Sequence, residues 1–221
     1  MRLLNTQDWS GLLRRRTITP EFFYFDLGKV VVTFDHAIAC RRIAHMTDCS
    51  LDQICAAIFA SGLQQRYELG EITERQFYEA FCSAVGKQPD FAEFLRAGSA
   101  IFELNEPVVD IIRQMSIAGH RLGILSNTCV SHWNYLNEGR FRVLRNYFEL
   151  AVLSFEVKCA KPNRAIYEHA AQRAAVAPER IFFVDDQPAN IAGAAACGWD
   201  AVQFETAQQL RHVLQQRGLA V

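Results

Sequence analysis

Residues 22–28 read Phe-Phe-Tyr-Phe-Asp-Leu-Gly, a short apolar run that ends in an acidic residue, Asp26. An apolar run of this length is typical of a β-strand that is covered on both faces, as in a parallel sheet. Four similar apolar runs come later in the chain. The run at 22–25 and the first three of these are each followed by turn-forming or polar residues and then by a helical pattern, and the last run comes after Gly198. The further runs lie at 122–125, 151–153, 181–184 and 201–204.

The segments between these runs carry helix signals. Pro107 opens a helix that presents apolar residues at helical spacing and that Gly119 closes. Asn163 is the expected N-cap of a second helix, and residues 189–197 form a third, rich in small residues, that stops at Gly198. Strands that alternate with helices in this way predict an α/β fold with a doubly wound parallel sheet.

Residues 36–105 interrupt this alternation, because they contain no obvious strand but several amphipathic helical stretches. Thr73-Glu-Arg-Gln76 is a capping box, and apolar residues follow it at helical spacing. We therefore expect an all-helical cap at 36–105, inserted into a Rossmann-like core formed by residues 21–35 and 106–221. Residues 1–20 would precede this core as an N-terminal arm, partly helical or irregular.

The bulk composition is that of a globular protein and argues against several partners. A chain of 221 residues can bury one substantial core, and its net charge of −1 gives no electrostatic reason to expect nucleic acid or an anionic membrane as partner. The Arg14–Arg16 run is expected to belong to a solvated extension. No apolar stretch approaches the roughly 18 residues that span a bilayer, and the first residues lack the apolar core of a signal peptide.

Cysteine usage favours a reducing compartment. The seven cysteines are an odd number and none belongs to a Cys-x-x-Cys pair, so neither a disulfide framework nor a zinc site is expected. The six histidines lack metal-ligand spacing. Reduced thiols in a cytoplasmic protein are the simpler interpretation, and the sequence leaves open whether the protein is a monomer or a homodimer.

Polar residues follow four of the predicted strands. Asp26 and Gly28 follow the first, Ser126-Asn127-Thr128 the second, and Asp185-Asp186 the fourth, while Lys161 comes shortly after the third. Taken alone, each has a plain structural explanation as a turn, a helix cap or a solvated lysine. The carboxyl ends of parallel strands form one crevice, so we expect these groups to converge although 159 positions separate Asp26 from Asp185.

Four segments carry a resemblance to a known family. They read FYFDLGKVVVTFD at 23–35, LGILSNT at 122–128, AKP at 160–162 and FFVDDQPANIAGA at 182–194. In this order and spacing the chain resembles the haloacid dehalogenase (HAD) superfamily over nearly its whole length, and the segment 36–105 resembles its C1-type helical cap. The FDLG opening looks most like the branch that contains sugar-phosphate phosphatases such as the glucose-1-phosphate phosphatases.

The resemblance implies a Mg²⁺-dependent phosphatase that hydrolyses a small phosphorylated metabolite, such as a sugar phosphate. Asp26 would attack phosphorus and form an aspartyl-phosphate, which splits one difficult displacement into two easier steps. The Asp26 carboxylate, the Gly28 carbonyl and Asp185 would hold the Mg²⁺. Lys161 would supply a compact positive charge that brings Asp26 and the phosphate together.

Further groups would complete the implied site around the phosphate and the metal. Ser126 and nearby backbone N–H groups, including that of Asn127, would bond the equatorial phosphate oxygens. Asp186 would order a metal-bound water or Lys161. Asn190, one helical turn further on, would steady that loop.

Two residues depart from the family pattern. Phosphatases of the superfamily usually carry a second Asp two residues after the nucleophile, as general acid and base, and loss of such help costs on the order of 10²- to 10⁴-fold in rate. Position 28 is Gly here, so the proton comes from water or a cap residue, the leaving group needs little help, or the protein has lost catalysis. Lys29 stands where a small or neutral residue is usual, and its side chain either enters the phosphate site or points to solvent.

Three other functions stay open on this scaffold. A 2-haloacid dehalogenase would share the Asp26 nucleophile without Mg²⁺, but the acidic pair at 185–186 has a clear purpose only beside a metal. A phosphate mutase would need the acid that position 28 lacks. A non-catalytic binding protein would explain Gly28 but not the joint presence of Asp26, Lys161 and Asp185.

Substrate selection is expected to fall to the cap. Residues 67–70 end one predicted helix before the capping box, so a loop there could overhang the crevice. Asp35 is expected to mark the hinge between core and cap. The candidate contacts are Arg42, His45, Tyr67, Glu68, Glu71, His132 and Trp133.

Overall fold

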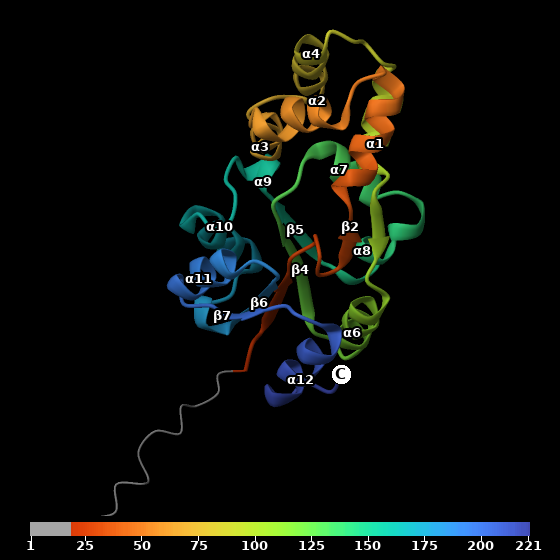
Figure 1. The fold of residues 1–221 in the computed structure, drawn as a ribbon. Helices are drawn as coiled ribbons and strands as arrows, with labels where there is room; N and C mark the ends of the chain where they lie inside the picture. The colour runs from red at the N-terminus through yellow and green to blue at the C-terminus, as the bar shows by residue number, and fades with distance from the viewer. Residues whose placement is uncertain (1–18) are drawn as a thin grey trace, which may run out of the picture.

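A computed structural model describes residues 19–221 of the chain. Its core is a five-stranded parallel sheet with the strand order β5-β4-β1-β6-β7 (Figure 1). Each predicted strand is confirmed to within one residue at either end. The arm predicted at 1–20, with its Arg14–Arg16 run, lies outside the described residues except for its last two. The strands are β1 (Phe22–Phe25), β4 (Arg121–Ser126), β5 (Leu150–Leu153), β6 (Ile181–Asp185) and β7 (Asp200–Gln203).

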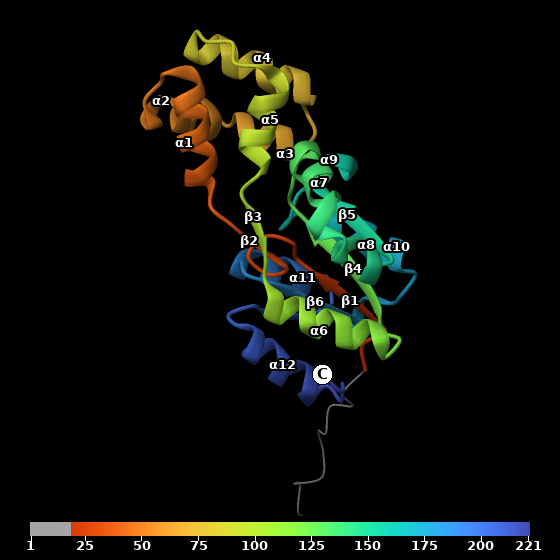
Figure 2. The same cartoon turned by 90° about the vertical axis from the view of Figure 1, so that its right-hand side faces the viewer.

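The strand β1 lies at the centre of the sheet, and all four of its residues are buried. Phe23 and Phe25 belong to the hydrophobic cluster that contains the buried apolar residues of α6 (Glu106–Ile117) and α12 (Ala207–Gln216), whereas Phe22 and Tyr24 belong to the cluster that contains those of α10 (Arg164–Ala174). Because successive side chains of a strand point to opposite faces, helices cover both faces of the sheet. The predicted doubly wound α/β fold is therefore confirmed, as Figure 2 shows from the side.

The helix signals in the core mark real helix ends. Asn105 is the N-cap before Pro107, and Gly119, with a φ of 82°, follows the end of the helix. Asn163 accepts a hydrogen bond from the Ala165 N–H at 3.0 Å, as expected of an N-cap. The core helices are α6 (Glu106–Ile117), α7 (Val130–Leu136), α8 (Val143–Tyr147), α9 (Ser154–Val157), α10 (Arg164–Ala174), α11 (Pro188–Ala196) and α12 (Ala207–Gln216), with short 3₁₀ turns at Gly139–Phe141 and Pro178–Arg180.

A separate group of helices stands above the sheet in Figure 1 and has its own hydrophobic cluster around Phe77, Phe81 and Phe94. Thr73 and Gln76 form the predicted capping box at the start of α4. We call this group the cap; that it is a domain of its own stays a prediction. Its helices are α1 (His36–Thr47), α2 (Leu51–Cys55), the π-helix η1 (Ala56–Ala60), α3 (Leu63–Glu68), α4 (Glu74–Val85) and α5 (Phe91–Ser99).

Two short strands connect the cap to the core. β2 (Val32–Phe34) and β3 (Phe102–Leu104) pair in an antiparallel fashion, with Phe34 opposite Phe102. The expectation that 36–105 holds no strand is therefore wrong at its C-terminal end. Three residues are too few to show a strand pattern, and β3 forms only because β2 lies beside it. Along residues 19–221, no helix is both long and apolar enough to cross a membrane.

Candidate active site

Asp26 is the first residue after β1, and the sheet fixes its position. Its backbone N–H donates to the Val184 carbonyl oxygen at 2.9 Å, so the pairing with β6 continues up to Asp26 itself. The residue is only 8% exposed. Burial raises the pKa of the Asp26 carboxyl; Lys161 opposes this rise and the charge of Asp185 adds to it. A carboxylate that is buried from solvent to this extent needs a cation beside it to stay ionised.

Lys161 supplies that cation. Its Nζ atom donates to Asp26 Oδ1 at 2.8 Å, to Asp185 Oδ2 at 2.5 Å and to the Leu125 carbonyl oxygen at 2.8 Å, which satisfies all three ammonium protons. Burial alone would lower the pKa of Lys161, but the carboxylates of Asp26 and Asp185 outweigh burial and hold the pKa above its ordinary value. Lys161, predicted to lie shortly after the third strand, is therefore a buried, charged group that joins Asp26, after β1, to Asp185, at the end of β6.

Asn127 holds the backbone of Lys161 in place. Its Nδ2 atom donates to the Lys161 carbonyl oxygen at 2.9 Å, and its Oδ1 atom accepts from the Lys161 N–H at 2.8 Å. The Ser126 side chain is buried beside it, and its hydroxyl lies 3.5 Å from the Asn127 carbonyl oxygen, a long contact that leaves it able to bond a ligand. The predicted phosphate-binding roles of Ser126 and Asn127 stay predictions, but the Asn127 side chain has this second task.

Asp185 ends β6 and is completely buried. Its Oδ1 atom accepts from the Gln187 N–H at 2.8 Å, and the Asn190 amide donates to both of its carboxylate oxygens at 3.0 Å. Asn190 lies on α11, which packs closely on the loop of Lys161: a Cβ atom at Gly193 would lie 2.9 Å from the Pro162 carbonyl oxygen. The structure thus places Asn190 where the sequence predicted a supporting residue.

Asp186 was predicted to order either Lys161 or a metal-bound water. The structure shows no contact between Asp186 and Lys161, and the role with the water stays a prediction. Its Oδ2 atom accepts from Gln187 Nε2 at 2.5 Å and lies 3.8 Å from Lys29 Nζ. The Lys29 side chain is 58% exposed, so it reaches the rim of the acidic cluster and not its interior. Lys29 therefore balances the outermost carboxylate of the site.

Three carboxylates gather at this edge of the sheet. One oxygen each of Asp26, Asp185 and Asp186 lie within 4.8 Å of one another. Ligands of one Mg²⁺ lie ~2.1 Å from the ion and hence no more than ~4.2 Å apart, so small side-chain adjustments suffice for a shared ion. An all-oxygen donor set of this kind suits a hard divalent cation. Asp186 thus joins Asp26 and Asp185 as a candidate ligand, and the role of the Gly28 carbonyl stays a prediction.

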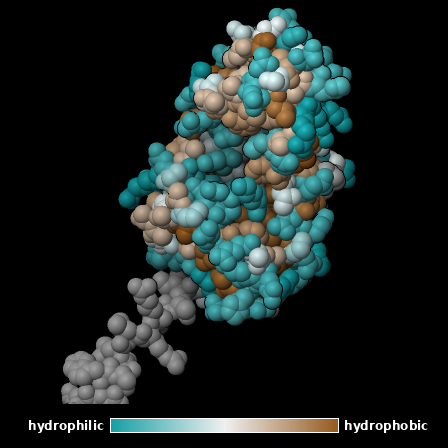
Figure 3. Space-filling model, viewed as in Figure 1, coloured by the Kyte–Doolittle hydropathy of each residue, from teal (hydrophilic) through white to brown (hydrophobic). Residues whose placement is uncertain are grey.

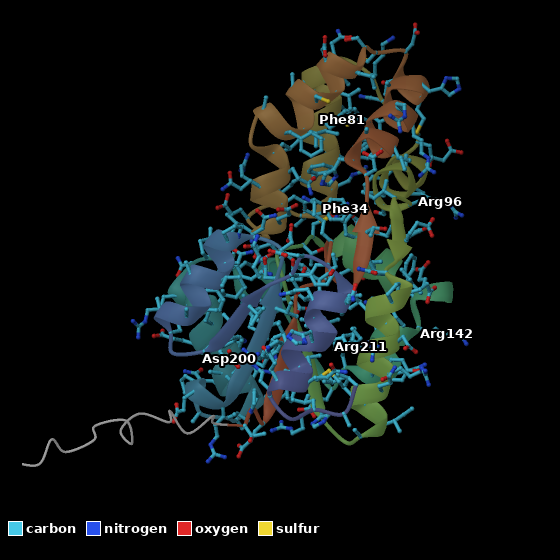
Figure 4. All side chains as sticks on the ribbon, turned by 60° about the horizontal axis from the view of Figure 1, so that its bottom comes forward. Phe34, Phe81, Arg96, Arg142, Asp200 and Arg211 are labelled. Carbon is cyan, nitrogen blue, oxygen red and sulfur yellow. The ribbon has the colours of Figure 1, made fainter. Side chains whose placement is uncertain are left out.

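Gly28 leaves no room for the side chain that the family usually has there. A Cβ atom at this position would lie 2.8 Å from Cε1 of Phe34, closer than carbon atoms approach without a clash. The Phe34 ring is itself held between His36, at 4.9 Å between ring centroids, and Phe102, at 5.8 Å. Figure 4 shows Phe34 where the core meets the cap, while Phe81 lies deep within the cap. An aromatic ring therefore occupies the space beside the missing acid.

The turn after α3 fastens the cap to the core on the side opposite β2 and β3. The Ser154 hydroxyl, at the start of α9, donates to the Glu68 carbonyl oxygen at 2.6 Å and accepts from the Thr128 N–H at 3.0 Å. Lys158 Nζ donates to the Gly70 carbonyl oxygen at 2.5 Å. A Cβ atom at Gly70 would lie 2.2 Å from the Phe155 carbonyl oxygen, so only glycine allows this approach. We call these contacts the latch.

Replacing Ser154 by alanine is expected to loosen the latch. The change leaves the Glu68 carbonyl and the Thr128 N–H without their partner, and a buried unsatisfied group costs about 1–3 kcal/mol. Amide hydrogen exchange at residues 68–70 should become faster than in the wild type. The control is Ser61→Ala, which removes a hydroxyl that bonds within the cap, to the Ala57 carbonyl oxygen at 2.6 Å. Equal exchange in both variants would show that Ser154 does not fasten the cap.

The predicted cap candidates divide into two groups. Arg42 donates to the Ala100 carbonyl oxygen at 2.7 Å and, with His45, lines a surface hollow that α1 and α5 form with Ala100, without core residues. Glu71 is exposed and lies 3.6 Å from Arg66. The structure places none of these three at the crevice. The prediction failed because a helical pattern shows which face of a helix is apolar but not in which direction the core lies.

The other candidates lie at the junction of cap and core. The Tyr67 hydroxyl accepts from the Ser131 N–H at 3.2 Å, and Tyr67 and His132 line one cavity there. The Glu68 carboxylate accepts from Gln64 Nε2 at 2.9 Å, and Trp133 packs against the core cluster. The sequence also missed His36, which lines the same cavity; its one signal is its place directly after Asp35, whose side chain caps α1.

The fold and the site define the class as a doubly wound α/β protein with an acidic cluster and a buried lysine at the carboxyl edge of its sheet, the edge at which such sheets bind ligands. The profile of the haloacid dehalogenase-like hydrolases matches residues 52–198. This is more than half of the chain, and the chain belongs to this family of hydrolases. The resemblance found in the four sequence segments is thereby confirmed.

Individual relatives agree with this assignment. The D-ribitol-5-phosphate phosphatase of Bacteroides thetaiotaomicron is 25% identical over 197 residues, which cover 86% of this chain and 94% of that protein. A HAD family enzyme of the same organism, solved in complex with magnesium and inorganic phosphate, matches with a TM-score of 0.77 at 23% identity over 88% of this chain and 98% of that one. A predicted HAD-like hydrolase from Porphyromonas gingivalis gives 0.75 at 21% identity, over 92% and 100%. At such identities the two structures establish a shared fold.

Proposed function

We propose that this protein is a Mg²⁺-dependent phosphatase that hydrolyses a small phosphorylated metabolite through an aspartyl-phosphate on Asp26. The observation that carries the proposal is the bridging position of Lys161, whose Nζ atom lies 2.8 Å from Asp26 and 2.5 Å from Asp185. The charged lysine partly neutralises two buried carboxylates and keeps them ionised. Such a site suits a dianionic substrate that arrives with a metal ion.

Asp26 would act as the nucleophile. One of its carboxylate oxygens attacks phosphorus, the bond from phosphorus to the ester oxygen breaks, and the alcohol leaves after it takes a proton from water. A second water then attacks the phosphorus of the aspartyl-phosphate, which releases inorganic phosphate and restores Asp26. Lys161 stays in contact with the carboxylate through both steps and offsets the charge that develops. A Mg²⁺ ion held by Asp26, Asp185 and Asp186 would supply further positive charge for the phosphate oxygens.

The relatives support a class of substrate and not one particular compound. A relative named for D-ribitol-5-phosphate at 25% identity supports a sugar or polyol phosphate as the substrate.

The seven cysteines all lie within the described residues and are all free thiols, which supports the cytoplasm as the compartment.

The test of this function is hydrolysis of p-nitrophenyl phosphate with Mg²⁺ and with EDTA. We expect turnover only with Mg²⁺, because the site then has the positive charge that a phosphate dianion requires. Asp185→Asn should weaken Mg²⁺ binding, measured by calorimetry, by about 10-fold or more, since it removes one charged ligand. Asp52→Asn, an exposed change in α2, is the control that should bind Mg²⁺ as the wild type does.

Two outcomes would replace this function. Release of chloride from a 2-haloacid without Mg²⁺ would identify a dehalogenase. Binding of Mg²⁺ without turnover of any ester in a broad panel of phosphate monoesters would identify a non-catalytic binding protein. Gly28 would agree with that function, because it cannot act as a general acid.

A further inference from the structure

Lys29 lies in a tight turn between β1 and β2 that fixes its backbone. The Leu27 carbonyl oxygen accepts from the N–H groups of Val31 and Val32 at 3.0 and 2.9 Å. The Lys29 N–H donates to the Val32 carbonyl oxygen at 2.6 Å. The neighbouring residues Leu27 and Val30 are buried, whereas the Lys29 side chain is 58% exposed. The lysine therefore projects into solvent from a turn that packing and hydrogen bonds hold in one conformation.

The backbone of Lys29 is left-handed, with a φ of 59°. A Cβ atom is crowded in this conformation, which glycine adopts without that cost. Three other non-glycine residues of the described chain have a positive φ, and each is the C-cap of a helix: Asp48, Lys158 and Ala175. Lys29 ends no helix, so its strain lacks this local explanation. Strain of this kind beside a site points to a function of the side chain.

The Lys29 side chain ends at the acidic cluster. Its Nζ atom lies 3.8 Å from Asp186 Oδ2, and one oxygen each of Asp186, Asp26 and Asp185 lie within 4.8 Å of one another. Lys161 pairs with Asp26 and Asp185 from the buried side. The cluster thus has one buried cation, which the core holds in place, and one exposed cation on a flexible stem.

Exposure to solvent rises from the interior of the cluster to Lys29. Asp185 is completely buried, the Asp186 side chain is 17% exposed and the Lys29 side chain 58%. In Figure 1 the strands β1 and β4 run toward the cap, and on the face seen in Figure 3 the surface is hollowed between the cap and the core. Lys29 therefore stands on the side of the cluster from which a dissolved anion arrives.

The charges of the cluster leave a place for Lys29 in the loaded site. Three carboxylates and two ammonium groups give the metal-free cluster one excess negative charge. With a divalent cation bound, the cluster would carry one excess positive charge, and without Lys29 the loaded cluster would be neutral. A phosphate dianion is attracted by an excess of positive charge. Lys29 therefore supplies charge that the buried groups alone do not.

We propose that Lys29 binds the phosphate group of the substrate by an exchange of partners: it pairs with Asp186 in the metal-free site and with a phosphate oxygen once Asp186 holds Mg²⁺. A carboxylate that already holds a divalent ion attracts an ammonium group less, and the flexible lysine stem lets Nζ turn while the backbone stays in place. Lys29 stands where the family usually has a small or neutral residue, so the family pattern does not supply this contact. The inference rests on the proposed phosphatase function and adds one substrate-binding residue to it.

The first measurement is Mg²⁺ binding by calorimetry in the absence of phosphate. In Lys29→Met the ion should bind about 3-fold more tightly than in the wild type at low ionic strength, because no ammonium group competes for Asp186. The difference should vanish in about 0.5 M NaCl, which screens an exposed ion pair. Lys29→Arg, which keeps the charge, should bind Mg²⁺ as the wild type does. So should Lys87→Met, which removes an exposed charge from the loop between α4 and α5.

The second measurement is the binding of inorganic phosphate with saturating Mg²⁺. In Lys29→Met phosphate should bind about 10-fold more weakly, the factor that loss of one charge-assisted hydrogen bond gives. Lys29→Arg should retain most of the affinity and Lys87→Met all of it. The affinities for Mg²⁺ and for phosphate therefore shift in opposite directions, which a general disturbance of the site would not produce.

Lys29→Gly separates the backbone strain from the charge. This variant should show both binding shifts of Lys29→Met but unfold at a higher urea concentration than that variant, because glycine adopts the left-handed conformation without crowding. Unchanged phosphate affinity in both variants would overturn the inference and leave Lys29 as a counterion of Asp186. Weaker binding of both Mg²⁺ and phosphate would overturn it as well, since a structural role predicts parallel losses.

Failure of the inference differs from failure of the proposed function, because the two binding measurements need no turnover. If the wild type binds no inorganic phosphate with Mg²⁺ present, both fall together. If p-nitrophenyl phosphate is hydrolysed but Lys29→Met keeps the phosphate affinity of the wild type, the inference falls alone. If the opposite shifts are found but no ester is hydrolysed, Lys29 is a phosphate-binding residue of a protein that is not a phosphatase.

Discussion

Replacing Asp26 by asparagine is expected to lower kcat for phosphate release on the order of 10⁴-fold or more, as loss of a nucleophile does in other covalent mechanisms. The amide keeps the shape of the carboxylate and still accepts a hydrogen bond from Lys161, now at 2.8 Å from Oδ1, but it is a poor nucleophile. The measurement is steady-state hydrolysis of p-nitrophenyl phosphate with Mg²⁺, with folding checked by circular dichroism.

Two further observations make this result specific to a covalent route. Wild-type enzyme quenched in acid during turnover should carry a phosphoryl label that hydroxylamine removes, as an acyl phosphate does, and Asp26→Asn should carry none. The exposed substitution Asp52→Asn should retain both rate and label. Residual activity of a tenth of the wild type in Asp26→Asn would mean that water attacks phosphorus directly and that Asp26 only positions it.

Replacing Lys161 by methionine is expected to lower the free energy of unfolding by about 3–5 kcal/mol when no metal is present. The change leaves the buried carboxylates of Asp26 and Asp185 facing each other without a cation, while methionine fills most of the space. Urea unfolding in EDTA measures the loss. Lys87→Met, at an exposed position in the loop between α4 and α5, is the control that should leave stability nearly unchanged.

The double variant Lys161→Met/Asp26→Asn distinguishes charge from packing. It removes one of the two unpaired carboxylates, so it should be more stable in EDTA than Lys161→Met alone. Addition of Mg²⁺ should stabilise Lys161→Met more than the wild type, because the ion replaces the lost positive charge. If the double variant is less stable than the single one, the lysine contributes through packing and the buried ion pair is not what holds the site.

The fold was accessible from the sequence because its signals are local. The apolar run 22–25 indicates a strand covered on both faces from its own residues alone, and all four residues are indeed buried. Pro107, Gly119 and Asn163 likewise act within one turn of a helix. The convergence of Asp26 and Asp185 was also predictable, since parallel strands place their carboxyl ends on one edge. The family resemblance supplied the remaining expectations about their roles.

Contacts between distant parts of the chain were not accessible in this way. Asn127 grips the backbone of Lys161, 34 positions away, and no spacing rule relates the two. The pairing of β2 with β3 spans the whole cap, and the latch joins Ser154 to Glu68 across 86 positions. Lys29 beside Asp186 is a further case, because the sequence left two directions open for its side chain and the structure chose the rim of the acidic cluster.

The ring of Phe34 above Gly28 has a consequence for how such a protein changes over time. An aspartate at position 28 would arrive against Cε1 of Phe34, 2.8 Å from where its Cβ must lie, so the single substitution is obstructed. Shrinking Phe34 first would open a void beside His36 and Phe102 and lose their packing. An evolutionary path that introduces the acid must therefore change both positions, and each of the two changes alone is expected to be destabilising. Positions 28 and 34 therefore constrain each other, and an acid at position 28 requires a smaller side chain at position 34.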